Sequence, residues 1–140
     1  MFLLDTNVVS EWVKPQPNAG VMRWVYEADE DRLFLSVITL AELRFGAARL
    51  AAGERRSRLD RWIGEELPGR FEGRILGIDR EVAEAWGRLM AASFVWGRRM
   101  NLMDCFLAAQ ATVNSLTLVT RNGADFEGFG GEVVDPWRIT

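Results

Sequence analysis

Met1-Phe-Leu-Leu-Asp-Thr-Asn7 is a short apolar run closed by three polar residues. This pattern predicts a buried strand over residues 1–4 that leads directly into a helix. Further strands are predicted at 33–36, 74–78, 116–120 and, as an edge strand, 132–134. The first predicted helix ends near Lys14, and further helices are predicted over about 18–26, 37–52, 55–67, 79–97 and 101–114. Short apolar strands alternating with helices are typical of an α/β fold with a mainly parallel sheet. We therefore expect one domain, residues 1–140, with about five strands and helices on both faces.

The composition excludes several kinds of active site. The chain has 140 residues, no histidine, one cysteine and a formal net charge of −3. Without histidine there is no imidazole base or His-ligated metal, and Cys105 alone forms neither an intramolecular disulfide nor a cysteine cluster. Any catalysis must use carboxylates, hydroxyls or arginines, with or without a hard metal ion. A lone cysteine fits a cytoplasmic protein, and no apolar run approaches the roughly 20 residues needed to cross a membrane.

Four acidic residues are placed where an open parallel sheet binds ligands, beyond the carboxyl ends of its strands. Asp5 follows the first strand and Asp125 lies in the loop after the fourth. Glu42 is in the early turns of the helix after the second strand, and Asp104 is in the first turn of the helix before the fourth. Together they predict an acidic cluster at one rim of the sheet.

Each acid also has a purely structural interpretation. Asp5 is a candidate N-cap, and Glu42 completes a capping-box match with Thr39. Asp104 stands three residues after Asn101 and has the same possible role, whereas Asp125 fits the Asn-Gly-Ala-Asp turn. Convergence of all four on one rim favours function, because caps are scattered wherever helices begin.

Clustered carboxylates need a cation to remain ionised together, because like charges raise one another's pKa values. Mg²⁺ or Mn²⁺ are the hard ions that take oxygen ligands and keep waters for a phosphate substrate. The residues alone therefore favour metal-assisted phosphodiester hydrolysis.

Two other residue types allow alternative interpretations. The 17 basic residues are arginines apart from Lys14, and many fall between residues 44 and 74. These arginines fit either a solvated helix face paired with neighbouring acids or a surface that contacts phosphates. The chain also has six tryptophans, which we expect to be packed mainly in the core.

Four motifs in order carry a resemblance to a known family. They are Leu3-Leu-Asp-Thr-Asn-Val8, the stretch from Ser36 to Gly46, the stretch from Asp104 to Ala111, and Thr120-Arg-Asn-Gly-Ala-Asp-Phe126. The chain resembles PIN-domain ribonucleases over nearly its whole length. It is most similar to VapC-type toxins of toxin–antitoxin pairs, including their FitB-like branch.

The resemblance implies a Mg²⁺-dependent endoribonuclease, with Mn²⁺ able to substitute. Asp5 and Asp104 would be the main metal ligands, Glu42 would help to hold the metal or its water, and Asp125 would complete the catalytic acids. The supporting residues would be Thr6, Asn7, Thr120 as a hydroxyl donor to a carboxylate, and Asn122, which stands where some relatives carry an acid.

The family also implies partners. They are an RNA substrate, a cognate antitoxin that wraps the toxin and blocks its site, and a second copy in a homodimer. DNA would be bound only indirectly, through the antitoxin, and no membrane is involved.

Other acidic α/β families fit less well. A phospho-receiver domain needs a late lysine, and a haloacid-dehalogenase-type phosphatase needs an Asp where this chain has Asn7. The remaining alternative is a non-catalytic PIN-like module that only binds RNA or protein. Such a module would usually have lost an acid, and the principal acids are all present.

Overall fold

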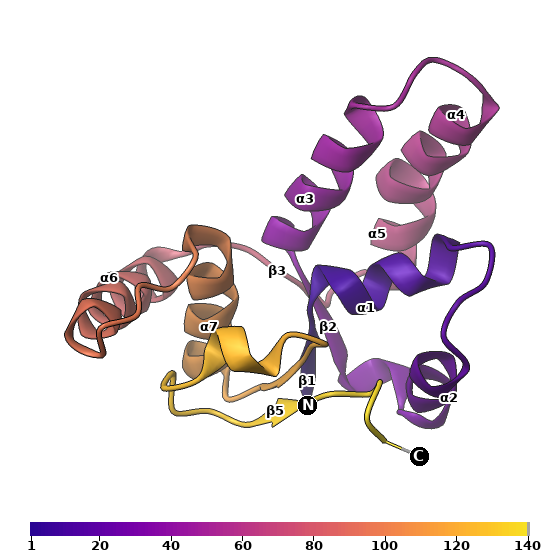
Figure 1. The fold of residues 1–140 in the computed structure, drawn as a ribbon. Coiled ribbons are helices and arrows are strands. Elements are labelled where there is room, and N and C mark those ends of the chain that lie inside the picture. Colours follow the sequence, from indigo (N-terminus) through magenta and orange to yellow (C-terminus); the bar gives the residue numbers. More distant parts are fainter. Residues whose placement is uncertain (140) are drawn as a thin grey trace.

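The computed structural model describes residues 1–139 and contains a five-stranded sheet with helices on both sides (Figure 1). The strand order is β3-β2-β1-β4-β5, and every neighbouring pair is parallel. The strands are β1 (Phe2–Leu4), β2 (Leu33–Ser36), β3 (Ile75–Leu76), β4 (Thr117–Val119) and β5 (Val133–Val134). The predicted single α/β domain with a parallel sheet and a terminal edge strand is confirmed.

Alternate residues of the central strands build two hydrophobic cores. Leu3 of β1 and Leu118 of β4 pack in the core under α6 (Arg80–Val95) and α7 (Leu102–Asn114). Leu4 and Val119 point to the opposite core. The helices α1 (Thr6–Ser10), α2 (Ala19–Glu27) and α5 (Leu67–Arg70) contribute to that second core. Because both faces are covered, most residues of the strands are apolar, as expected of a parallel sheet.

Helix α3 (Val37–Ala48) and helix α4 (Glu54–Arg61) form a hairpin that extends away from the sheet (Figure 1). The prediction that the first of these helices continues to residue 52 is wrong. The chain needs residues 49–53 to reverse direction, and Arg56 donates a hydrogen bond to the free carbonyl of Leu50 in this connection.

The prediction that the next helix ends before Pro68 is also wrong. The π-helix η3 (Trp62–Glu66) follows α4 directly and leads into α5, which includes Pro68. The N–H of Leu67 bonds to the carbonyl of Trp62, five residues earlier. This wider turn accommodates a proline that a regular helix would exclude, because proline has no N–H and clashes with the carbonyl four residues before it.

Side-chain caps define the other helix starts as predicted. Asn18 caps α2, Asp79 caps α6 and Asn101 caps α7, each by accepting hydrogen bonds from backbone N–H groups of the first turn. Three short 3₁₀ helices complete the described elements: η1 (Glu11–Val13), η2 (Glu30–Arg32) and η4 (Gly123–Phe126). None of the helices within residues 1–139 is both long and apolar enough to span a bilayer.

The strand order determines where a ligand can bind. Strand β1 is central, with β2 on one side and β4 on the other, so the chain crosses over in opposite directions from this point. The crevice beyond the carboxyl ends of such strands is the usual binding site of an open parallel sheet. Asp5 directly follows β1, and Thr120 directly follows β4.

Candidate acidic site at the carboxyl edge of the sheet

Asp5 is held rigidly at the centre of this edge. The residue is only 6% exposed. One carboxylate oxygen accepts the N–H of Thr6 at 2.7 Å, as an N-cap does. The other accepts the hydroxyl of Thr120 at 2.7 Å and the amide of Asn7 at 3.3 Å. The predicted hydroxyl donation by Thr120 is therefore present, and three donors from the ends of two strands hydrogen-bond to Asp5.

Burial raises the pKa of Asp5 above its usual value, whereas these hydrogen bonds act in the opposite direction. A carboxylate that is buried and also bonded by several donors is held in one orientation. The Thr120 hydroxyl in turn accepts the N–H of Asn122 at 3.1 Å, which ties the loop after β4 to the same group.

Glu42 reaches the edge from α3. One of its carboxylate oxygens accepts the hydroxyl of Thr6 at 2.7 Å, and that hydroxyl also lies 3.3 Å from the Thr39 hydroxyl. The capping-box interpretation of Thr39 and Glu42 is wrong, because Ser36 is the N-cap of α3 and accepts the N–H of Ile38 at 3.0 Å. Glu42 therefore points to the Thr6 side of the site instead of capping its own helix.

Asp104 contributes from the first turn of α7. The cap of this helix is made by the side chain of Asn101, which accepts the N–H groups of Met103 and Asp104. Burial is the largest cause that raises the pKa of Asp104, followed by the negative charges of Asp5, Asp125 and Glu42 in that order, and together they bring it to about 6. Asp104 is thus close enough to the other three acids to be repelled by all of them.

Asp125 completes the set from η4 and is exposed. Its N–H closes the predicted turn by bonding to the carbonyl of Asn122 at 2.9 Å. Its carboxylate lies 3.5 Å from the guanidinium of Arg98, a long and weak ion pair. The turn interpretation of Asp125 is confirmed, and its charge also acts on Asp104 at the acidic edge.

The oxygen-bearing side chains at this edge are of the kind that bind a hard cation, although they are not already gathered into a metal-binding cluster. Within residues 1–139, no three acidic side chains are drawn together as a preformed metal cage. The available oxygens come from carboxylates, hydroxyls and amides, which Mg²⁺ prefers, and the repulsion that acts on Asp104 is what a bound cation would relieve. Cys105 is no competing ligand, since burial raises the pKa of its thiol to about 11.

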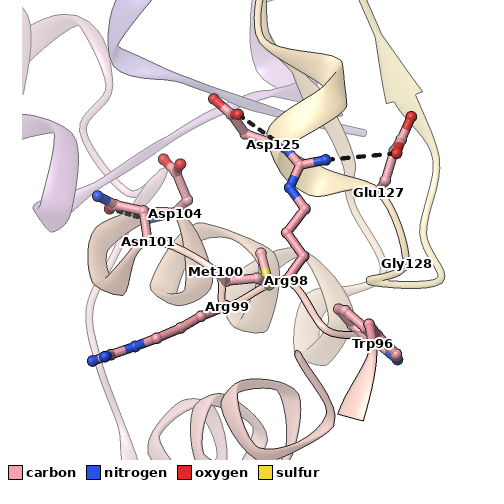
Figure 2. A pocket seen from close by; sticks show the side chains of 9 residues that line it. All are labelled: Trp96, Arg98, Arg99, Met100, Asn101, Asp104, Asp125, Glu127 and Gly128. Carbon is pink, nitrogen blue, oxygen red and sulfur yellow. Dashed lines mark hydrogen bonds and ion pairs between the residues drawn. The ribbon is translucent and has the colours of Figure 1, made fainter. Parts of the chain in front are cut away.

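A cavity of about 560 Å³ opens beside two members of the set, the half-buried Asp104 and the exposed Asp125 (Figure 2). Trp96, Arg98 and Arg99 also line it. Sequence reasoning missed these three as site residues. The available signal was Trp96-Gly-Arg-Arg99, an aromatic and two cations placed just before the Asp104 motif.

The tryptophans mostly follow the expectation. Five of them are partly buried and pack against one of the two cores: Trp12, Trp24, Trp62, Trp86 and Trp137. Trp96 is the exception at 42% exposed. It stands at the end of α6, beyond the reach of the core, so core packing is the wrong interpretation for this residue.

The arginine-rich stretch divides between the two interpretations. Asp60 pairs with Arg44 at 2.8 Å and with Arg56 at 3.9 Å, whereas Arg70 pairs with Glu30. Arg74 donates to backbone carbonyls, including that of Leu33 at 2.7 Å. In the described part of the chain, no acidic partner lies within ion-pair distance of Arg49, Arg55, Arg58 and Arg61. These four remain available for an anionic partner.

Comparison with known proteins agrees with this geometry. The PIN domain family matches residues 2–131. The chain is 38% identical to VapC ribonuclease Y4jK of Sinorhizobium fredii and 36% identical to Toxin FitB of Neisseria gonorrhoeae, with 99% of each chain covered in both cases. The structure of FitAB bound to an IR36 DNA fragment superposes with a TM-score of 0.94 at 34% identity, covering 100% of this chain and 98% of that one. The chain therefore belongs to the PIN-domain family and lies among its VapC- and FitB-type members.

Proposed function

We propose that this protein is a Mg²⁺-dependent endoribonuclease that acts as the toxin of a toxin–antitoxin pair. The observation that carries the proposal is that Asp5, Glu42, Asp104 and Asp125, from four separate segments, interact at one edge of the sheet. Relatives named as a VapC ribonuclease and a toxin support the assignment. The non-catalytic alternative is disfavoured because each of these acids is present.

Asp5 and Asp104 would hold the ion, since they are the two more buried acids and Asp5 is the acid whose charge raises the pKa of Asp104 most. When bound, Mg²⁺ would lower the pKa of an attacking water and offset the charge that builds on the phosphate oxygens. Thr6, Asn7 and Thr120 fix the carboxylate of Asp5 through the hydrogen bonds described above. Glu42, which is bonded to Thr6, and Asp125, which lies beside the cavity, would accept protons from waters at the rim.

The proposed partners are an RNA substrate, an antitoxin protein and a second copy of the chain, with DNA reached only through the antitoxin. Exposed apolar side chains support protein partners: Phe45 on α3 is 65% exposed, and Phe94 and Val95 at the end of α6 are 61% and 86% exposed. Light scattering of the purified chain would show a dimer mass, and a monomer at all concentrations would contradict the homodimer.

The metal and the activity are tested separately. Calorimetric titration with Mn²⁺ is expected to show saturable binding that Asp5→Asn and Asp104→Asn each weaken severely. Absence of binding at millimolar metal in the wild type would refute the site. Cleavage of structured RNA should require Mg²⁺, stop with EDTA and be lost in Asp5→Ala, and equal cleavage by that variant would reveal a contaminant.

The toxin role has its own readout. Expression is expected to arrest growth, and co-expression of a small adjacent open reading frame that encodes the antitoxin is expected to restore it. Growth arrest that Asp5→Ala retains would contradict toxicity through this site.

A further inference from the structure

Trp96, the exposed tryptophan, lines the same cavity as Asp104 and Asp125. Trp96 ends α6, and its ring lies against Gly128, where an added Cβ would approach the ring carbons to 3.2 Å. Gly128 has φ +89°, a conformation that favours glycine, and the absence of a side chain there lets the indole approach the loop backbone closely. The ring is thereby fixed on one face, yet 42% of the residue stays exposed.

Two arginines follow Trp96 on a loop that is anchored to the core. The buried hydroxyl of Ser93 accepts the N–H of Met100 at 3.2 Å and donates to the carbonyl of Met90 at 2.7 Å. The N–H of Arg98 donates to the carbonyl of Ser93 at 3.3 Å. Both ends of the segment 97–100 are therefore held, and the positions of Arg98 and Arg99 are set by the fold.

The two guanidinium groups are positioned but not saturated. Arg98 lies between Asp125, at 3.5 Å, and Glu127, at 3.7 Å, and its side chain is 57% exposed (Figure 2). Arg99 lies over the exposed ring of Phe94, 5.4 Å from its centroid. Ion pairs this long and this exposed contribute little, so exchanging them for a phosphate carries a small penalty.

We propose that this cavity is a nucleotide subsite, in which the base of one unpaired RNA nucleotide stacks on Trp96 while Arg98 and Arg99 bind the adjoining phosphates. The cavity, about 560 Å³, lies within the range of roughly 300–1,000 Å³ that is usual for small-molecule sites. Unpaired bases are commonly bound by stacking on aromatic side chains, with arginines on the backbone. Asp104 and Asp125 line the same cavity, so a nucleotide there brings its phosphodiester to the acids. This inference rests on the proposed ribonuclease function.

RNA binding in EDTA tests the subsite without cleavage. The probe is a short fluorescein-labelled single-stranded RNA of random sequence, followed by fluorescence anisotropy. Trp96→Ala is expected to raise Kd by about 5- to 150-fold, the usual effect of losing one stacked base. Trp96→Phe keeps an aromatic face and should stay close to the wild type. Arg98→Gln is expected to weaken binding and to reduce the slope of log Kd against log salt by about 0.7, as loss of one phosphate contact does.

Matched controls separate the cavity from general surface effects. Tyr26→Ala removes an exposed aromatic on α2, and Arg88→Gln removes an exposed arginine on α6, the helix that ends near the cavity. Neither should change Kd. RNA that contains 5-iodouridine should cross-link on irradiation to the peptide that carries Trp96.

Unchanged Kd in Trp96→Ala, cross-links that map elsewhere, or no RNA binding by the wild type would each overturn the subsite. Mn²⁺ titration of Trp96→Ala should match the wild type, because the metal ligands are unaltered. Trp96-dependent RNA binding without Mg²⁺-dependent cleavage would refute the nuclease and keep the subsite. If the protein cleaves RNA but Trp96→Ala binds RNA as tightly as the wild type, the subsite is refuted and the nuclease is kept. The subsite is also refuted if Trp96→Ala loses affinity only for a protein partner.

Discussion

Asp104→Asn should stabilise the metal-free protein while abolishing its response to Mg²⁺. Burial and three neighbouring acids raise the pKa of Asp104 from 3.8 to about 6. Between these two values the folded state retains a proton that the unfolded state has lost. Stability therefore falls as pH rises through this window and stays reduced above it. At neutral pH the ionised carboxylate of Asp104 lowers the free energy of unfolding, and a neutral asparagine does not.

The size of the effect follows from this shift. About two pKa units correspond to roughly 3 kcal/mol, and because the carboxylate is only about half buried, solvent screening reduces this to about 1–2 kcal/mol. In EDTA, the free energy of unfolding of Asp104→Asn minus that of the wild type should rise from near zero at pH 4 to about 1–2 kcal/mol at pH 7. Urea denaturation across this pH range measures it. Asp31→Asn, an exposed acid in η2 at the opposite end of β2, is the control and should show no such rise.

Added Mg²⁺ completes this test. At about ten times its Kd, the ion should stabilise the wild type by about 1.4 kcal/mol through mass action. Asp104→Asn should gain little. A variant that is destabilised equally at every pH would refute the repulsion, and equal stabilisation of both proteins by Mg²⁺ would place the ion elsewhere.

Three further substitutions test the supports of the site. Thr120→Val removes the hydroxyl that donates to Asp5 at 2.7 Å. It should lower the free energy of unfolding at pH 7 by about 1.5–3 kcal/mol and weaken Mn²⁺ binding. An unchanged urea midpoint would contradict the hydrogen bond. Gly128→Ala forces a side chain against the Trp96 ring at a positive φ. It should lower the free energy of unfolding, measured by thermal denaturation, by about 1–3 kcal/mol. Its Mn²⁺ affinity should be unchanged. Ser93→Ala leaves the buried N–H of Met100 without its acceptor. It should lower the free energy of unfolding in urea by about 1–3 kcal/mol and weaken RNA binding. Stability equal to that of the wild type would show that this hydrogen bond does not anchor the loop.

Local sequence signals predicted most of the fold because they act over a few residues. The apolar runs identified the strands, and Asn18, Asp79 and Asn101 marked helix starts by their ability to accept backbone N–H groups. The errors fall where tertiary packing intervenes. Pro68 signals a helix end, but the π-turn before it lets the helical segment continue to Arg70. Thr39 and Glu42 match a capping box, but Ser36 occupies the cap.

The candidate site shows the same division. The sequence indicated Asp5, Glu42 and Asp125 because they come after strands that end at one edge of a parallel sheet, and Asp104 because it lies in the first turn of the helix that leads back into β4. It did not indicate Arg98 or Trp96, since nothing within the local pattern relates the end of α6 to η4. Their proximity depends on the packing of α6 against α7 and on the loop at Gly128.

The sequence by itself determined the parallel α/β architecture, excluded histidine chemistry and indicated four candidate carboxylates, because these inferences depend on periodicity, composition and the positions of strand and helix ends. Only the tertiary structure decided how those acids interact. It buried Asp5 under three hydrogen bonds, brought Asp104 within repulsive range of the others, and left Trp96 exposed beside two arginines. The physical reason is that pKa shifts, burial and cavities depend on distances between residues that are remote along the chain, and only the packed fold sets those distances.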